Sequence, residues 1–230
     1  MKVFKEKDFK WRGGNVSRLE SIVDAVFAIA VTLLIVSRDI PSDFDEFMNV
    51  MLSFVGFIFT FTFLFMIWYA HYLFHRRFGL EDFKTIILNL VLIFFVLFYI
   101  YPLKFLSEVL FGMWFGTYDK FTGPIDMQSL MIIYGIGMFM IWLIFGFLYR
   151  HAYRFRNDLK LNSMEKQITI ESMQVYFLMS IFGLISTIIA LANYPALSGW
   201  FYCGIGPAIF LLLTFNKYVI RSESSRTKKL

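Results

Sequence analysis

Long stretches without charged residues dominate the pattern of apolar and polar positions along the chain. Four stretches lack Asp, Glu, Lys and Arg altogether: 50–74, 85–103, 127–149 and 172–216. A helix needs about 20 apolar residues to cross the roughly 30 Å hydrocarbon core of a bilayer. The first three stretches therefore each predict one membrane-spanning helix, and the fourth is long enough for two.

The fourth stretch contains a break. Pro195 and Gly199 lie inside "ANYPALSGW", and both residue types favour turns. An apolar segment near the N-terminus adds a further helix. The sequence thus predicts an all-α integral membrane protein with six transmembrane helices, near 17–37, 47–75, 84–107, 128–153, 167–193 and 197–218. They form one domain over 1–220, which a basic cytoplasmic tail at 221–230 follows.

Positive charge is distributed unevenly between the loops. With six helices, the two termini and the second and fourth loops share one side. That side carries 19 of the 22 Lys and Arg residues, and the others are Arg38, Lys104 and Lys120. Lys and Arg concentrate on the cytoplasmic side of membrane proteins, so both termini are expected there. The net charge of +5 then reflects topology and phospholipid contact, and nucleic acid is not an expected partner.

Residue types that carry catalysis are sparse. Only 17% of the chain is charged, against about 25% in soluble domains. The single cysteine, Cys203, cannot form an internal disulfide and is assigned to packing. His71, His75 and His151 have no convincing nucleophile beside them, and there is no Walker loop or HExxH motif. We expect no enzymatic activity, no cofactor and no resident metal ion.

The first predicted helix carries an aliphatic stripe. At about 100° per residue, one face collects Arg18, Ile22, Ala25, Ile29, Thr32, Leu33 and Val36. Asp24 lies on the other side, about 120° from Arg18, so the two are not expected to pair on a straight helix. Such a stripe is also typical of ordinary helix packing, and the hydroxyl of Thr32 would commonly bond its own helix.

Asp24 needs polar partners on other helices, because an ionised carboxylate in the apolar zone is costly alone. The second helix offers Trp68 and His71 (with His75 one turn on), and the third offers Asn89 near its start. The alternating topology puts them at a similar depth. The cluster either locks three helices together or forms a site for a proton or substrate.

Three strings resemble a known family. "RLESIVDAVFAIAVTLL" from Arg18 resembles the first-helix signature of the transmembrane-protein-175 family, the potassium channels of endosomes and lysosomes and their prokaryotic relatives. That signature is usually Arg, three residues, then Phe-Ser-Asp, and Ile22 and Val23 replace Phe-Ser here. "WYAHYLF" at 68–74 is similar to its second-helix Trp/His motif, and "LNLVLIFFVLFYIYP" at 88–102 to its third-helix Asn…Pro motif.

The resemblance implies a potassium-permeable channel in which first helices line the pore and rings of aliphatic side chains act as constriction and gate. Carried onto this chain, Ile29 forms the main ring, Leu33 a second ring one turn outward, Thr32 a hydroxyl ring, and Val36 lies near the outer mouth. Potassium would pass transiently near Ile29, Thr32 and Leu33, with modest selectivity over other monovalent cations. In this frame Arg18, Asp24, Trp68, His71 and Asn89 form the polar network that holds the pore helix.

No second copy of the first-helix string is present. The resemblance therefore implies a prokaryotic-type, single-repeat member that assembles as a homotetramer in a cell membrane. The main alternative is a proton- or ion-coupled secondary transporter that uses Asp24, His71 and Asn89, although no Gly/Pro-interrupted pair of helices appears in matching positions. A non-transporting membrane assembly factor is a third reading. The outer segment 104–126 is assigned a solvated, partly interfacial role.

Overall fold

The computed structural model describes residues 9–36, 42–115 and 126–227. Those residues contain helices and no strand. The helices are α1 (Arg18–Val36), α2 (Phe44–Phe78), α3 (Phe83–Phe115), α4 (Met127–Arg154), α5 (Ser163–Leu191), α6 (Pro195–Phe201), a 3₁₀ turn (Tyr202–Gly204) and α7 (Ile205–Thr227). The all-α prediction is confirmed.

Two helices extend past their predicted ends. α2 begins at Phe44 rather than 47, and α3 continues to Phe115 instead of ending near 107. Pro102 lies inside α3, where it removes one backbone donor without ending the helix. At 1.5 Å per residue both helices approach about 50 Å, longer than the hydrocarbon core. The first part of the predicted outer loop 104–126 is therefore helical.

The C-terminal hairpin differs from the single helix predicted at 197–218. Asn193 takes a left-handed conformation (φ 67°) after α5, and Pro195 starts α6, where a missing N–H costs nothing. The 3₁₀ turn then leads into α7, which runs to Thr227. Most of the segment assigned to a basic tail is thus helical backbone.

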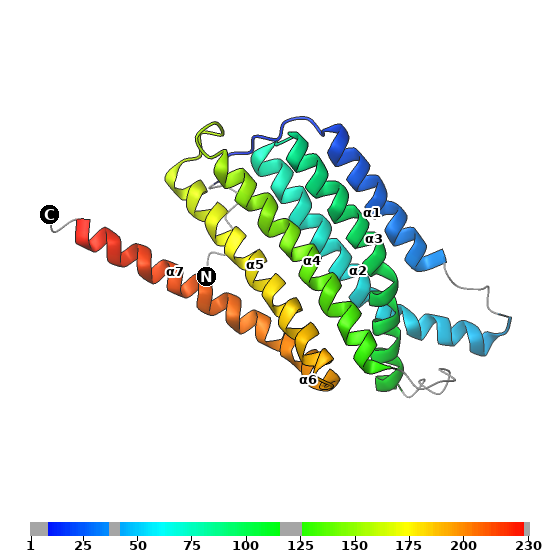
Figure 1. The fold of residues 1–230 in the computed structure, drawn as a ribbon. Helices are drawn as coiled ribbons and strands as arrows, with labels where there is room; N and C mark the ends of the chain where they lie inside the picture. Colours follow the sequence, from blue (N-terminus) through cyan, green and yellow to red (C-terminus); the bar gives the residue numbers. More distant parts are fainter. Residues whose placement is uncertain (1–8, 37–41, 116–125, 228–230) are drawn as a thin grey trace.

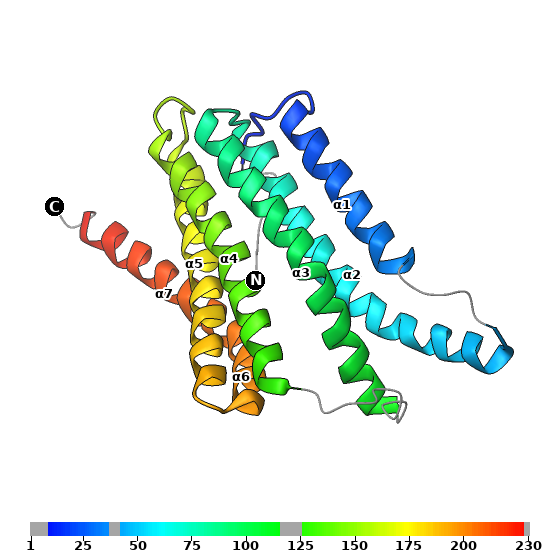
Figure 2. The same ribbon diagram turned by 45° about the vertical axis from the view of Figure 1, so that its right-hand side comes forward.

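The bundle is packed most closely between α4 and α5. A Cβ on Gly183 would lie 2.5 Å from the backbone nitrogen of Phe139, and one on Gly135 would lie 2.9 Å from the carbonyl of Gly183. Only glycine permits this approach. Figures 1 and 2 show α4 and α5 running side by side, with α2 and α3 next to them and α1 at the edge. Buried aromatic residues such as Phe74, Trp142 and Tyr149 fill the core.

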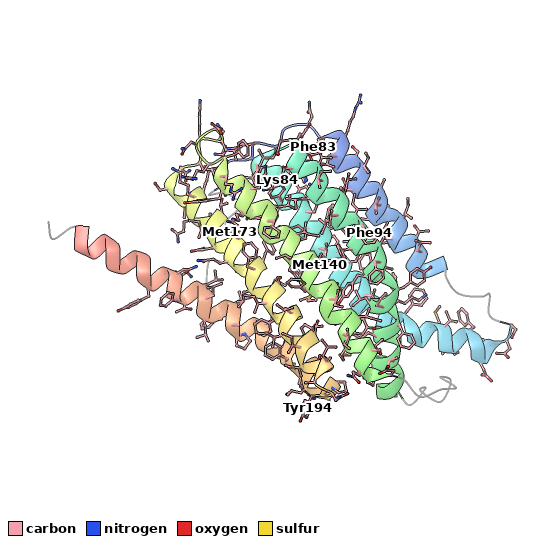
Figure 3. The ribbon with its side chains drawn as sticks, viewed as in Figure 1. Phe83, Lys84, Phe94, Met140, Met173 and Tyr194 are labelled. Carbon is pink, nitrogen blue, oxygen red and sulfur yellow. The ribbon has the colours of Figure 1, made fainter. Side chains whose placement is uncertain are left out.

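Within the described residues, five helical segments are long and apolar enough to cross a membrane: Gly56–Phe78, Phe83–Leu106, Met127–Arg154, Ser163–Leu191 and Pro195–Tyr218. α1 is not among them, and its described side chains end at Leu33. Apolar side chains cover the outside of these helices, for example Phe94 on α3 (Figure 3). This exterior suits lipid rather than water.

Candidate pore helix and its polar anchors

α1 starts with a capping box. The backbone N–H of Glu20 donates to Oγ of Ser17 (3.1 Å), and the N–H of Ser17 donates to Oε1 of Glu20 (3.2 Å). This pairing satisfies two of the amide groups that a helix start leaves without partners. Ser17 and Glu20 are both buried, so the start of α1 is anchored against the bundle. The spacing Ser-x-x-Glu in the sequence is typical of a capping box and could have predicted this helix start.

The two faces of α1 have opposite environments. Val23, Phe27 and Ala30 are at most 5% exposed and pack into the core of the chain. Ile22 and Ile29 are each 55% exposed, and Leu33 is 41% exposed. Ala25, Ala28 and Thr32 on the same outer side are exposed as well. The predicted stripe therefore points away from its own bundle, at the free edge that α1 occupies in Figure 2.

Thr32 and Val36 lie toward the C-terminal end of the stripe. The hydroxyl of Thr32 donates to the carbonyl of Ala28 (2.9 Å), one turn back in the same helix. Its lone pairs stay free to accept or to face a cation. Val36 ends α1, and its side chain lies outside the described part of the structure.

Asp24 meets one of its expected partners. Nε1 of Trp68 on α2 donates to Oδ1 of Asp24 over 2.8 Å. Asp24 is otherwise exposed, and among the described residues no hydrogen bond joins it to Arg18. Arg18 is also exposed and has no side-chain partner within the described part of the chain. Two charged groups therefore remain on the surface of α1.

His71 and Asn89 lie elsewhere, inside the bundle. Both are at most 1% exposed, as is His75, and the rings of His71 and His75 are 4.4 Å apart. The amide of Asn89 donates to the carbonyl of Thr85 (2.8 Å). Nε2 of His71, both ring nitrogens of His75 and Oδ1 of Asn89 have no hydrogen-bond partner among the described residues. The expected cluster is thus divided into an outer Asp24–Trp68 pair and an inner His71–His75–Asn89 group.

A strap before α1, residues 9–14, joins both halves of the bundle. The guanidinium of Arg12 donates to Oε2 of Glu165 on α5 (2.7 Å) and to the carbonyl of Leu159 (2.7 Å). The Arg12 and Gly13 amides donate to the carbonyl of Arg76 at the end of α2. The Glu165 side chain is 1% exposed. Sequence reasoning missed this strap, because the partners are far apart in the chain.

A second polar contact joins the start of α3 to the end of α4. Nε2 of His151 lies 2.9 Å from Oδ2 of Asp82, and the hydroxyl of Thr85 donates to Oδ1 of Asp82 (2.7 Å). Burial raises the pKa of Asp82, but the hydrogen bonds from Thr85 and His151 and the charge of His151 outweigh it, so the pKa is lowered overall. Among the described residues no group of three or more His, Cys, Asp or Glu side chains is arranged to hold a metal ion.

Comparison with known proteins supplies a family. Residues 18–99 match the family model described as "Endosomal/lysosomal potassium channel TMEM175". A protein of Marivirga tractuosa named "Potassium channel" is 35% identical over 234 residues, which cover 95% of this chain and 93% of that protein. The chain belongs to the TMEM175 family. It is therefore an integral, multi-pass membrane protein, as the sequence predicts.

The fold agrees with this membership in the TMEM175 family. The crystal structure of a variant of the potassium channel MtTMEM175, bound to a nanobody–MBP fusion, superposes with a TM-score of 0.84 at 34% identity, over 94% of this chain and 100% of that one. The crystal structure of a "lysosomal potassium-selective channel TMEM175 homolog" from Chamaesiphon minutus gives a TM-score of 0.50 at 20% identity, over 82% of this chain and 96% of that one. The latter likeness concerns the fold alone.

Proposed function

We propose that this protein is a potassium-permeable cation channel whose pore is lined by α1 from each of four subunits. Membership in a family of potassium channels supports this reading. The observation that carries it is the outer face of α1, where aliphatic and small side chains are exposed in the single chain. Ala25 and Ala28 allow close approach of helices, and Ile29 and Leu33 supply bulk at regular intervals.

Lipid is a poor partner for that face. Arg18 lies on this face of α1 and is exposed, and a charged side chain exposed to hydrocarbon costs about 3 kcal/mol or more. In an oligomer this face instead meets polar groups of other subunits and the water of the pore. We propose a homotetramer with six spans per chain and both termini in the cytoplasm, in the cell membrane of a prokaryote.

Ile29 and Leu33 would form the constriction. A narrow ring of aliphatic side chains can close a pore by dewetting. When the ring is hydrated, its aliphatic side chains offer no carbonyl oxygens. A passing cation therefore loses part of its hydration shell without gaining protein ligands in its place. Potassium sheds water more readily than sodium, and modest selectivity for potassium follows. The hydroxyl of Thr32 already donates to Ala28, so its free lone pairs face a permeating cation with the correct polarity.

The Asp24–Trp68 hydrogen bond fixes α1 against α2 on the side away from the pore. Together with the strap at Arg12 it determines where Ile29 sits. In this reading His71 and Asn89 are part of the same framework and do not touch the permeating ion.

The inner His71–His75–Asn89 group favours one alternative. Its unpartnered ring nitrogens and amide oxygen are buried beside α1, which is the chemistry of a proton site in an ion-coupled transporter. Such a protein would move ions only with a proton gradient. The channel proposal requires passive, non-saturating flux.

The test is potassium and sodium flux through purified protein in liposomes, with valinomycin to define full potassium release. Ile29→Asn places a wettable ring at the constriction, and we expect about a tenfold rise in flux, equivalent to about 1.4 kcal/mol. Ile133→Asn, on the exterior of α4, is the matched control and should leave flux unchanged. Unchanged flux in Ile29→Asn and Leu33→Asn, or flux that needs a proton gradient, would overturn the pore assignment.

A further inference from the structure

α5 and α7 diverge toward the membrane face at which α5 begins. In both Figure 1 and Figure 2, α7 leaves the bundle and runs outward to the C-terminus. A groove of about 380 Å³ opens between the two helices. Nδ2 of Asn216 donates to Oε1 of Gln174 over 2.6 Å and joins the walls of the groove.

The groove lies at the level where both helices change character. The first three turns of α5 are rich in polar residues, including Lys166, Gln167 and Glu171, whereas α5 beyond Gln174 is largely apolar. α7 is largely apolar up to Phe215, Asn216 and Lys217 follow, and from Arg221 onward it is polar. α5 is about 43 Å long, so its polar end extends beyond a hydrocarbon core of about 30 Å. The Gln174–Asn216 bridge lies where the polar start of α5 meets its apolar part.

The polar part of the groove offers one positive and one negative group. The ammonium of Lys166 has no hydrogen-bond or ion-pair partner among the described residues. Oε1 of Glu171 accepts a hydrogen bond from Nε2 of Gln167 (2.8 Å), which leaves Oε2 as an acceptor. The walls also carry Ile170 and Phe215, and exposed Phe210 and Leu211 continue the apolar surface of α7 toward the membrane centre.

We propose that this groove binds the headgroup of a phospholipid with a primary amine, such as phosphatidylethanolamine. The phosphate contacts Lys166, and the ammonium donates to Glu171. The acyl chains follow α7 past Phe215. A choline headgroup has no N–H to donate to Glu171, and a glycerol headgroup has no cation to pair with it. The preference for an amine therefore follows from the two opposite charges.

A second copy of the chain fits this groove less well. The described helices carry many exposed apolar side chains, for example Ile133, Phe147 and Ile188. An apolar helix in the groove would bury Lys166 and Glu171 without partners, which is strongly unfavourable. A zwitterionic headgroup satisfies both and remains partly hydrated.

The experiment uses the purified protein in detergent, incubated with equimolar dioleoyl phosphatidylethanolamine, phosphatidylcholine and phosphatidylglycerol. After excess lipid is removed, retained lipid and oligomeric state are measured by native mass spectrometry. We expect phosphatidylethanolamine to be enriched about fivefold over phosphatidylcholine. Lys166→Gln should lower retention of all three lipids about fivefold, and Glu171→Gln should abolish only the preference for the amine.

Two substitutions serve as controls. Glu81→Gln and Lys84→Gln remove exposed charges just before and at the start of α3. Lys84 lies at the same end of the bundle as the start of α5 but away from α7 (Figure 3). Both should retain lipid as the wild type does. Equal retention of all lipids by the wild type, equal losses in the controls, or enrichment of phosphatidylglycerol over the amine lipid would overturn the proposal. A changed oligomeric state in Lys166→Gln with unchanged lipid would instead indicate a second copy in the groove. Because lipid retention does not depend on ion flux, failure here leaves the channel proposal standing.

Discussion

The contact between α4 and α5 and the attachment of α1 hold helices in two different ways. α4 and α5 approach so closely that glycine is required at Gly135 and Gly183, and buried side chains line both helices. α1 buries only the face with Val23 and Phe27, and its other attachments are the capping box, the Asp24–Trp68 bond and the strap. Continuous close packing produces a rigid scaffold. A few anchor points leave one whole face of α1 available to other subunits.

The strap connects these two regions, and breaking it is expected to have the largest effect. Arg12→Gln leaves the buried carboxylate of Glu165 without its counter-ion, and we expect a loss of about 3 kcal/mol in the free energy of unfolding. Thermal unfolding of the detergent-solubilised protein measures it. Lys10→Gln removes a neighbouring exposed charge and is the control. An equal loss of unfolding free energy in both variants would mean that the Arg12–Glu165 ion pair does not stabilise the fold.

Widening the α4–α5 contact is expected to have the next largest effect. Gly183→Ala places a methyl group 2.5 Å from the backbone nitrogen of Phe139, so the two helices must separate. We expect the free energy of unfolding to fall by about 2 kcal/mol. Gly206→Ala on α7 is the matched control, because nothing lies within 4 Å of its added Cβ. If both variants unfolded at the same temperature, the α4–α5 contact would accommodate a methyl group, and close packing there would not require glycine.

Loosening the anchor of α1 is a smaller change. Trp68→Phe keeps an aromatic ring but removes the N–H that donates to Asp24. We expect the free energy of unfolding to fall by about 1.5 kcal/mol. The proportion of intact oligomer after mild heating should fall with it. Trp200→Phe, 74% exposed on α6, is the control. An unchanged oligomer with altered ion preference would show that Asp24 acts in the pore itself.

The Asp82–His151 contact gives the smallest effect and a pH dependence. Because the pKa of Asp82 is lowered in the folded chain, its contribution is present above the unfolded value of about 3.9 and is lost as pH falls through the folded value. Asp82 is partly exposed, so screening limits the contribution to about 0.5 kcal/mol. Unfolding temperatures of the wild type and Asp82→Asn should differ at pH 6, and the difference should shrink as the pH falls below about 4. A constant difference across this range would exclude the charge as the cause.

Several features of the candidate site were predictable from residue periodicity. The 3.6-residue repeat placed Ile22, Ile29 and Leu33 on one face, and the structure leaves that face exposed. The role of this face as a pore lining stays a prediction. Periodicity could not tell a face that packs inside the chain from one that meets other subunits, since both are aliphatic. It also could not show that Trp68, rather than His71, would reach Asp24, because that depends on the rotation of α2 about its own axis.

The sequence by itself determined the all-α membrane architecture and the approximate helix limits, because hydrocarbon excludes charges and demands internally satisfied backbone groups. The tertiary structure alone decided which helix faces are buried, that α7 diverges from α5, and that the Arg12 strap joins α2 to α5. These features depend on contacts between residues as far as 153 positions apart. Such contacts arise only when whole helices pack, and no local pattern encodes them.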